Sequence, residues 1–415
     1  MFDELQIDDR RERWLVGLAD LALAPIGDIG RWRARPPTVA PPRRVLLFRL
    51  ERIGDLLMTL DTLGLLRARL PEAELHLVVG SWNAELARLI PGIDAVETLD
   101  VPWLSRGGSR PSPWTLAAQA ARWRRRAFDL AINFEPDIRS NVLVGASGAP
   151  RRVGYATGGG GAFLTDAAVY DKRVHVAVNA RRLVEHATAT NARRLVERAT
   201  ATVGTQRVSE RARAPAAAPM PQLRIPAESH ARAGRLLAGH DGRGPLVGLN
   251  PGAGRTVKEW PPQRFARTAA ELAARDRATI VLLGSAAERP LGEAVRKHVG
   301  NDAPLIDLVG RTPLVDLAAV LARIQVLVTG DTGPMHLAAA VGTPVVGIFG
   351  PTDPARYAPL IERSAAVHAN LWCRPCHRTR RPPARCRHGA PDCLVGVGTD
   401  DVVAAVRSLQ VLGRR

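Results

Sequence analysis

Short apolar runs recur along the chain, and longer segments with apolar residues at helical spacing separate them. The first three runs lie at 45–48, 75–79 and 128–133, and a helix is expected at 55–70 after the first. Runs of this length are typical of strands buried on both faces, and their alternation with helices indicates a parallel sheet. This part of the chain therefore predicts an α/β domain.

A second series of the same kind begins near residue 245. Strands are expected at 246–250, 279–283, 325–328 and 344–349, and helices at 263–275, 288–299, 314–322, 334–341 and 400–412. The two series predict two doubly wound domains, and ligands of such domains bind at the carboxyl ends of the strands.

The length of 415 residues also favours two domains. A segment at 204–226 is rich in Ala, Pro, Arg and Ser, and it is the best candidate for a linker. We therefore expect an N-terminal extension at 1–42, a first domain at 43–225, a second domain at 226–398 and a C-terminal helix at 399–415.

The N-terminal extension carries Trp and Leu side chains at roughly helical spacing over residues 14–23, followed by a stretch rich in Arg and Pro. Two interpretations stay open. The segment is either a helix packed on the main body, or an amphipathic helix with a basic flank that lies on a membrane surface.

A tandem repeat occupies residues 179–202. Residues 179–190 and 191–202 are identical at eleven of twelve positions. The second copy of such a helix would be rotated by roughly 120° from the first, so the apolar faces of the two copies do not align. We interpret the repeat as a duplication that lengthens a surface helix or loop.

The formal net charge of +18 favours anionic partners such as nucleic acid, anionic lipid or phosphorylated glycans. Arginine carries most of this charge, in short clusters such as 122–126. Aromatic residues make up only 4% of the chain, too few for the stacking platforms of a single-strand nucleic-acid surface, so we expect no nucleic-acid binding. The chain begins with acidic residues and has no apolar run long enough for a signal peptide or a membrane span. We expect a cytoplasmic protein with peripheral contact to the anionic inner membrane.

Three segments at predicted strand ends carry candidate chemistry. The first, at 49–55, has the sequence R-L-E-R-I-G-D and places Asp55 near the start of a helix. A carboxylate there is favoured electrostatically and can be a plain helix cap. It can equally serve as a general base exposed at the carboxyl end of the strand.

The second segment, at 250–260, has the sequence N-P-G-A-G-R-T-V-K-E-W. Gly252 and Gly254 let backbone N–H groups approach an anion, and Thr256 and Lys258 add a hydroxyl and a positive charge. This suits a diphosphate, although the spacing differs from that of a P-loop. A structural turn with a solvated lysine is the alternative.

The third segment, at 330–340, has the sequence G-D-T-G-P-M-H-L-A-A-A. Asp331, Thr332 and Gly333 present an acceptor, a hydroxyl and free amides at a helix N-terminus, and His336 lies on the first turn of this helix. The alternative is a capped helix with an incidental histidine.

Together these segments resemble the glycosyltransferase family that contains the lipopolysaccharide heptosyltransferases, family 9. The similarity covers about residues 44–100 and 245–395. Its most specific parts are I-G-D at 53–55, K-E-W-P at 258–261 and D-T-G-P-M-H-L-A-A-A at 331–340. The resemblance implies a GT-B fold of class α/β, with two Rossmann-like domains and the active site in the cleft between them.

The resemblance also implies roles for individual residues. Asp55 would deprotonate the acceptor hydroxyl, in an acceptor-side loop that includes Arg52 and Gly54. Lys258 would neutralise the donor diphosphate as it leaves. The other donor-binding candidates are Gly252, Gly254, Thr256, Ser285, Glu288, Asp331, Thr332, Gly333 and His336.

The function expected from this resemblance is inverting transfer of a heptose from a nucleotide-sugar, ADP-heptose, to a phosphorylated or lipid-linked cell-envelope glycan such as the lipopolysaccharide core. No cofactor or catalytic metal is expected, because a lysine and helix-terminal amides can stabilise a diphosphate. Two alternatives stay open: the same fold acting on another nucleotide-sugar, and a non-catalytic basic glycan-binding protein.

Four cysteines fall within 373–393, at Cys373, Cys376, Cys386 and Cys393. Four thiols this close in sequence could bind a structural zinc ion tetrahedrally, with His377 and His388 nearby. Their spacing is not that of a standard zinc ribbon. Free or locally paired thiols are therefore the second interpretation.

Overall fold

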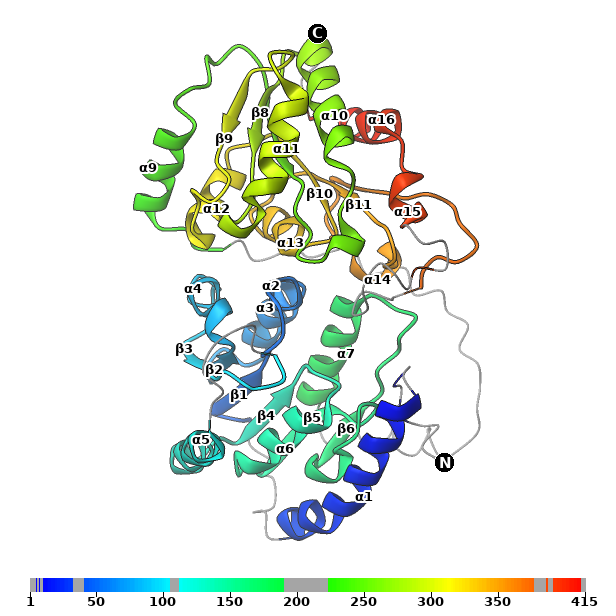
Figure 1. The fold of residues 1–415 in the computed structure, drawn as a ribbon. Helices are drawn as coiled ribbons and strands as arrows, with labels where there is room; N and C mark the ends of the chain where they lie inside the picture. The colour runs from blue at the N-terminus through cyan, green and yellow to red at the C-terminus, as the bar shows by residue number, and fades with distance from the viewer. Residues whose placement is uncertain are drawn as a thin grey trace. The chain divides into compact units, whose positions relative to one another are not determined.

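The computed structural model describes residues 5, 7, 10–32, 41–104, 112–189, 223–376, 386 and 391–411. The chain divides into two compact units, unit 1 at Met1–Pro221 and unit 2 at Gln222–Arg415. Each unit contains one parallel sheet, with helices on both faces (Figure 1). The second copy of the repeat and most of the expected linker lie outside the described residues.

The sheet of unit 1 has the strand order β3-β2-β1-β4-β5-β6, and every neighbouring pair is parallel. The order reverses between β1 and β4, which is the place where doubly wound sheets bind ligands. The strands are β1 (Arg44–Phe48), β2 (Glu74–Val79), β3 (Ala95–Thr98), β4 (Leu130–Asn133), β5 (Arg151–Tyr155) and β6 (Asp166–Ala168).

The described helices of unit 1 cover this sheet. They are α1 (Arg10–Trp32), α2 (Ile53–Leu57), α3 (Leu60–Arg69), η1 (Ser81–Asn83), α4 (Ala84–Ala87), α5 (Pro113–Arg126), α6 (Ile138–Ala146), η2 (Gly161–Phe163) and α7 (Val176–Thr188). The N-terminal helix α1 packs against η2 and α6 (Figure 1). The first copy of the repeat falls mostly within α7.

The helix expected at 55–70 is divided into α2 and α3. The hydroxyl of Thr59 donates to the carbonyl of Leu56 at 2.6 Å, and Thr59 is the cap residue of α3. Threonine side chains that bond to the local backbone favour helix ends over helix interiors. The division leaves a short helix, α2, that begins within the Arg49–Asp55 segment.

Unit 2 repeats the architecture with the strand order β12-β11-β10-β7-β8-β9, again with parallel neighbours. Its order reverses between β7 and β10. The strands are β7 (Leu246–Asn250), β8 (Thr279–Leu282), β9 (Leu305–Asp307), β10 (Val326–Gly330), β11 (Val345–Ile348) and β12 (Ser364–Val367).

The helices of unit 2 form two groups. One group contains α10, α11 and α16, which pack on one another, and α12 joins α9 and α13 in the other. The described helices are α9 (Ala227–Leu236), η3 (Thr256–Lys258), α10 (Pro262–Asp276), η4 (Ala286–Glu288), α11 (Arg289–Val299), α12 (Leu314–Leu321), α13 (Gly333–Ala340), α14 (Pro354–Tyr357), α15 (Asp392–Val395) and α16 (Thr399–Ser408).

Each unit has its own hydrophobic core. In unit 1 the rings of Phe48 and Trp123 meet edge to face at 5.1 Å, and in unit 2 Trp260 and Phe265 do so at 4.9 Å. Burying one large apolar side chain contributes roughly 1.5–3 kcal/mol. The fold class expected from the sequence is therefore confirmed. No helix in the described ranges is both long enough and apolar enough to cross a membrane.

Candidate functional site

The segment after β1 is organised around one buried arginine. Arg49 is 2% exposed, and its guanidinium donates to the carbonyl oxygens of Asp55 and Phe134, each at 3.1 Å. It also pairs with the carboxylates of Glu51 at 3.1 Å and Asp55 at 3.8 Å. Burial alone would lower the pKa of Arg49, but the surrounding carboxylates outweigh this and raise it. Arg49 therefore stays charged and ties both ends of the segment to β4.

Glu135, which follows β4, holds the same segment from the other side. One of its carboxylate oxygens accepts the backbone N–H groups of Leu50 and Glu51, the latter at 3.0 Å. The side chain is almost fully buried, and this burial raises the pKa of Glu135 to about 7, against the opposing effect of Arg49 and the two amides. The sequence analysis missed Glu135, although it directly follows an apolar strand at the same sheet edge.

Asp55 lies in the first turn of α2. Its Oδ2 accepts the backbone N–H of Arg52 at 3.1 Å, so the capping role considered from the sequence is present. The side chain is still 27% exposed, which leaves the carboxylate accessible.

Burial and the negative charge of Asp55 raise the pKa of the neighbouring Glu51. Gly54 precedes Asp55 in α2, and the Arg52 guanidinium lies 5.8 Å from the centroid of the Trp82 ring.

In unit 2, three loops converge on one carboxylate. Lys258 Nζ lies 2.6 Å from Asp331 Oδ2 and 3.3 Å from the Asp331 carbonyl oxygen. The Thr352 hydroxyl donates to the same Oδ2 at 2.7 Å. These residues follow β7, β10 and β11, so the structure brings the second and third predicted segments together. Thr352 was not among the predicted site residues.

Polar side chains near Lys258 and Asp331 link the carboxyl ends of β7 and β10. The Asn250 amide donates to the Gly252 carbonyl at 2.9 Å and to the Thr329 hydroxyl at 3.2 Å. The Thr329 hydroxyl lies 3.4 Å from that of Thr332, the cap residue of α13. Two further glycines have local roles: Gly254 has φ +61°, and Gly333 begins α13.

The loop after β8 reaches the glycine turn. Glu288 Oε2 accepts from the Ser285 backbone N–H at 2.7 Å and from its hydroxyl at 2.9 Å. A Cβ at Gly252 would lie 1.9 Å from Glu288 Oε1, so the turn approaches this carboxylate as only glycine can. Ser285 and Glu288 therefore lie beside the predicted diphosphate turn.

Two predicted donor-site residues occupy regular elements. Thr256 begins the short helix η3 that ends at Lys258, and His336 is buried in α13. The arrangement offers a cation, several hydroxyls and the N-terminus of α13 along the carboxyl ends of β7 and β10. Such a set suits a phosphorylated ligand.

The four cysteines are free thiols, and Cys393 is buried. Burial raises the pKa of Cys393 to about 11, which keeps its thiol protonated. Among the residues that the structure describes, no group of three or more His, Cys, Asp or Glu side chains is arranged to hold a metal ion. His377, His388 and the insert at 378–384 lie outside these residues, so zinc at the cysteines stays a prediction.

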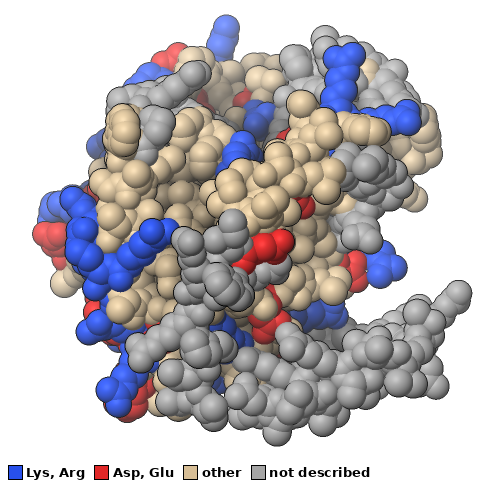
Figure 2. Space-filling view, turned by 90° about the horizontal axis from the view of Figure 1, so that it is seen from below, with Lys and Arg blue, Asp and Glu red and all other residues tan. Residues whose placement is uncertain are grey.

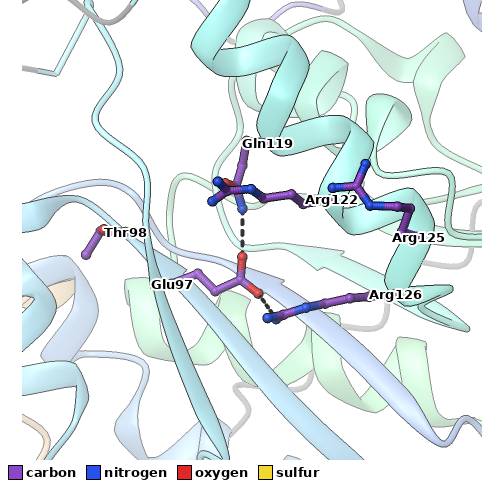
Figure 3. Close-up of a pocket in the computed structure, with 6 residues that line it drawn as sticks. All are labelled: Glu97, Thr98, Gln119, Arg122, Arg125 and Arg126. Carbon is purple, nitrogen blue, oxygen red and sulfur yellow. Dashed lines mark hydrogen bonds and ion pairs between the residues drawn. The ribbon is translucent and has the colours of Figure 1, made fainter.

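A surface pocket of about 500 Å³ lies elsewhere in unit 1 (Figure 3), lined by Glu97, Thr98, Gln119, Arg122, Arg125 and Arg126. Glu97 bonds to Gln119 and Arg126. The Arg126 carbonyl accepts from Arg44 at the start of β1, while Glu97 on β3 is in register with Val78 of β2, which pairs with Phe48 at the end of β1. Basic side chains gather on the left in Figure 2, the side of α5 in Figure 1. No predicted site residue lines this pocket.

Comparison with known proteins extends these findings. The sequence model of glycosyltransferase family 9 (heptosyltransferase) matches residues 117–384, which include the Lys258 and Asp331 segments but not Asp55. Lipooligosaccharide heptosyltransferase 2 of Haemophilus influenzae is 33% identical over 129 residues, 30% of this chain and 37% of that protein. Lipopolysaccharide heptosyltransferase 2 of Salmonella typhimurium is 25% identical over 327 residues, 78% of this chain and 87% of that protein.

Among solved structures, the Escherichia coli ADP-heptose lipopolysaccharide heptosyltransferase II superposes with a TM-score of 0.67 at 20% identity. The superposition covers 88% of this chain and 98% of that one, which supports the fold. Because the family model matches more than half of the sequence, the chain belongs to glycosyltransferase family 9, the heptosyltransferase family, and is a glycosyltransferase with two Rossmann-like units of the GT-B type.

Proposed function

We propose that this chain transfers a heptose from ADP-heptose to a cell-envelope glycan, such as the lipopolysaccharide core, with inversion at the anomeric carbon. The observation that carries the proposal is the contact of Asp331 with both Lys258 and Thr352 at the ends of β7, β10 and β11. The family membership and the names of the relatives support heptose as the sugar.

The donor diphosphate would take the place of Asp331 as the partner of Lys258. Lys258 is 18% exposed and Asp331 9%, so an anion that reaches Lys258 is poorly screened by water. The Gly333 amide at the N-terminus of α13 and the Thr332 hydroxyl would share the remaining negative charge. This assigns the stabilisation of the leaving group to the side chains of unit 2.

Asp55 would act as the general base. Arg49 and the Arg52 amide hold its carboxylate, and the side chain remains accessible. It would take the proton of an acceptor hydroxyl while the hydroxyl oxygen bonds to the anomeric carbon. The bond from that carbon to the diphosphate oxygen breaks in the same step, and this single displacement inverts the carbon. We place the reaction in the cytoplasm, with a phosphorylated or lipid-linked acceptor.

The test measures ADP-heptose binding and ADP release with a lipopolysaccharide core that lacks heptose. We expect Asp55→Asn to bind donor like the wild type while kcat falls about 100- to 10,000-fold. Lys258→Ala should weaken donor binding and lower kcat on the order of 100-fold. The control is Asp276→Asn, because Asp276 also pairs with one arginine, Arg407, but lies at the far end of α10.

Transfer by Asp55→Asn at the wild-type rate would contradict the base assignment. A wild-type chain that ignores ADP-heptose but binds another nucleotide-sugar would show that the family is right and the sugar wrong. If no nucleotide-sugar binds, the assignment of Lys258 and Asp331 to a donor site is wrong.

A further inference from the structure

The buried guanidinium of Arg49 lies at the centre of the segment that carries Asp55. Arg49 directly follows β1, which lies between β2 and β4 (Figure 1), and it is only 2% exposed. Its Nε donates to the Asp55 carbonyl and its Nη1 to the Phe134 carbonyl, each at 3.1 Å. Its backbone N–H donates to the Val78 carbonyl of β2 at 3.0 Å. Arg49 is therefore fixed to the carboxyl ends of three neighbouring strands.

The two carboxylate oxygens of Asp55 have different surroundings. Oδ2 accepts the backbone N–H of Arg52 at 3.1 Å, which is the capping contact of α2. Oδ1 lies 3.8 Å from Arg49 Nη2, a distance that suits an ion pair but is too long for a hydrogen bond. In the part of the chain that the structure describes, Oδ1 accepts no hydrogen bond. Its lone pairs are therefore free to take a proton.

Glu51 gives the same guanidinium a second carboxylate partner. Its Oε2 accepts from Arg49 Nη1 at 3.1 Å, so the two terminal nitrogens of one planar group face different carboxylates. The Glu51 backbone is itself fixed, because its carbonyl accepts from Trp82 Nε1 and Asn83 Nδ2, each at 2.9 Å. This second contact keeps the guanidinium from closing onto Asp55 Oδ1.

The charges of Glu51 and Asp55 are also linked. Burial, and after it the negative charge of Asp55, raises the pKa of Glu51. When Asp55 takes a proton and becomes neutral, the second of these effects disappears, so Glu51 holds its own charge more readily beside Arg49. The buried cation therefore keeps a partner while Asp55 changes its charge, and an unpaired buried cation would be costly.

We propose that Arg49 is a positioning residue for sugar transfer, whose guanidinium sets the place and orientation of Asp55 Oδ1, the oxygen that takes the acceptor proton. This rests on the proposed function, in which Asp55 is the general base. The hydroxyl proton passes to Oδ1 as the hydroxyl oxygen bonds to the anomeric carbon, and the diphosphate leaves with the electron pair of the broken bond. Because Arg49 is buried, it acts through Asp55 and touches neither substrate.

The test is a double-mutant cycle of Arg49→Lys and Asp55→Asn in the full chain, with ADP-heptose and a heptose-free core glycan as substrates. Lysine keeps the positive charge but cannot place two nitrogens as a guanidinium does. We expect Arg49→Lys to lower kcat about 10- to 100-fold while donor affinity stays within about twofold of the wild type. In the double variant kcat should stay within about threefold of that of Asp55→Asn, because Arg49 acts only through this carboxylate.

The matched control is Arg152→Lys. Arg152 is 3% exposed in the same unit, and it also donates to two backbone carbonyls, those of Ala149 and Phe163, each at 2.7 Å. It lies at the amino end of β5, whereas Asp55 follows the carboxyl end of β1. We expect both lysine variants to lose unfolding free energy, but only Arg49→Lys to lose kcat.

A second variant carries the test if Arg49→Lys does not fold. Glu51→Ala removes a side chain that is 37% exposed and leaves Arg49 in place. The guanidinium is then free to close onto Asp55 Oδ1 and occupy the oxygen that should take the proton. We expect kcat to fall about tenfold, again with no further loss in the Asp55→Asn background.

Three results would overturn the inference while the base assignment stands. They are a wild-type kcat in Arg49→Lys, a double variant in which the two single losses multiply, and an equal loss of kcat in Arg152→Lys. A different result, transfer by Asp55→Asn at the wild-type rate, would remove the proposed base and the inference with it. The two kinds of failure are therefore distinguishable within one set of variants.

Discussion

At the scale of single residues, unit 1 keeps three carboxylates around one buried guanidinium. Arg49 contacts Glu51 and Asp55, and Glu135 holds the intervening backbone. With more negative than positive charge in a poorly hydrated place, one carboxyl tends to keep its proton. Burial raises the pKa of both Glu51 and Glu135, so these two carboxyls compete for the proton, and Glu135 is the more deeply buried of the two.

This balance gives a pH-dependent stability. Burial raises the pKa of Glu135 to about 7, so the folded chain holds this proton more tightly than the unfolded chain. The stabilisation is complete below the ordinary carboxyl pKa and is lost as the pH rises through about 7. We expect Glu135→Gln, which can still accept both amides, to gain unfolding free energy relative to the wild type between pH 5 and 8, by up to about 3 kcal/mol.

Urea unfolding at several pH values measures this gain. Glu185→Gln serves as the control, because Glu185 is 41% exposed and lies on the surface of α7. A difference between Glu135→Gln and the wild type that stays constant from pH 5 to 8 would show that Glu135 does not change its protonation in this range.

At the scale of elements, the turn after β7 packs on the loop after β8. Gly252 faces Glu288, whose other oxygen is bound by Ser285. A methyl group at Gly252 must displace the Glu288 carboxylate and break its two bonds to Ser285. The turn after β7 and the end of η4 are therefore packed together at this carboxylate.

We expect Gly252→Ala to weaken ADP binding about tenfold or more, with a small loss of unfolding free energy, because only a flexible side-chain end must move. Calorimetric titration with ADP measures this. Gly239→Ala is the control, since a Cβ there meets its neighbours at ordinary distances of 3.9 Å or more. If the double variant Gly252→Ala/Glu288→Ala binds no better than Gly252→Ala alone, the displaced carboxylate is not the cause.

The elements differ in how far the sequence predicts them. The central strands β1, β7 and β10 are apolar runs buried on both faces, and the expected bounds agree with the structure to within two residues. The edge strands β6 and β12 contain mainly small or polar residues, such as Asp166-Ala-Ala, and gave no apolar run. Edge strands are half covered, so selection for large apolar residues is weaker there.

The residues of the candidate site also differ in how far the sequence predicts them. Asp331 and Lys258 were expected from motifs, but their contact joins residues 73 positions apart and depends on β10 lying beside β7. Glu135 gave no motif, because its role is to accept two backbone amides of the segment after β1, which only folding brings near. Pairings set by strand order are not encoded in local sequence.

At the scale of the whole molecule, the donor-side residues all belong to unit 2. Lys258, Asp331 and Thr352, with the Ser285–Glu288 loop, lie on one sheet with its own core. We expect residues 222–415 expressed alone to fold and to bind ADP within about tenfold of the full chain, but to transfer no sugar. Calorimetry and the ADP-release assay measure the two properties. A folded fragment that binds no ADP would show that unit 1 supplies part of the donor site.

The docking of α1 has a consequence for how the chain is made. The helix ends at Trp32, but Gly160 and η2, which receive its inner face, come more than a hundred residues later. At the usual pace of about 5–20 residues per second, a ribosome needs on the order of ten seconds to reach them. During that interval the contacts of α1 with η2 and Gly160 cannot form. The order of synthesis therefore makes the docking of this helix a late step in the folding of unit 1.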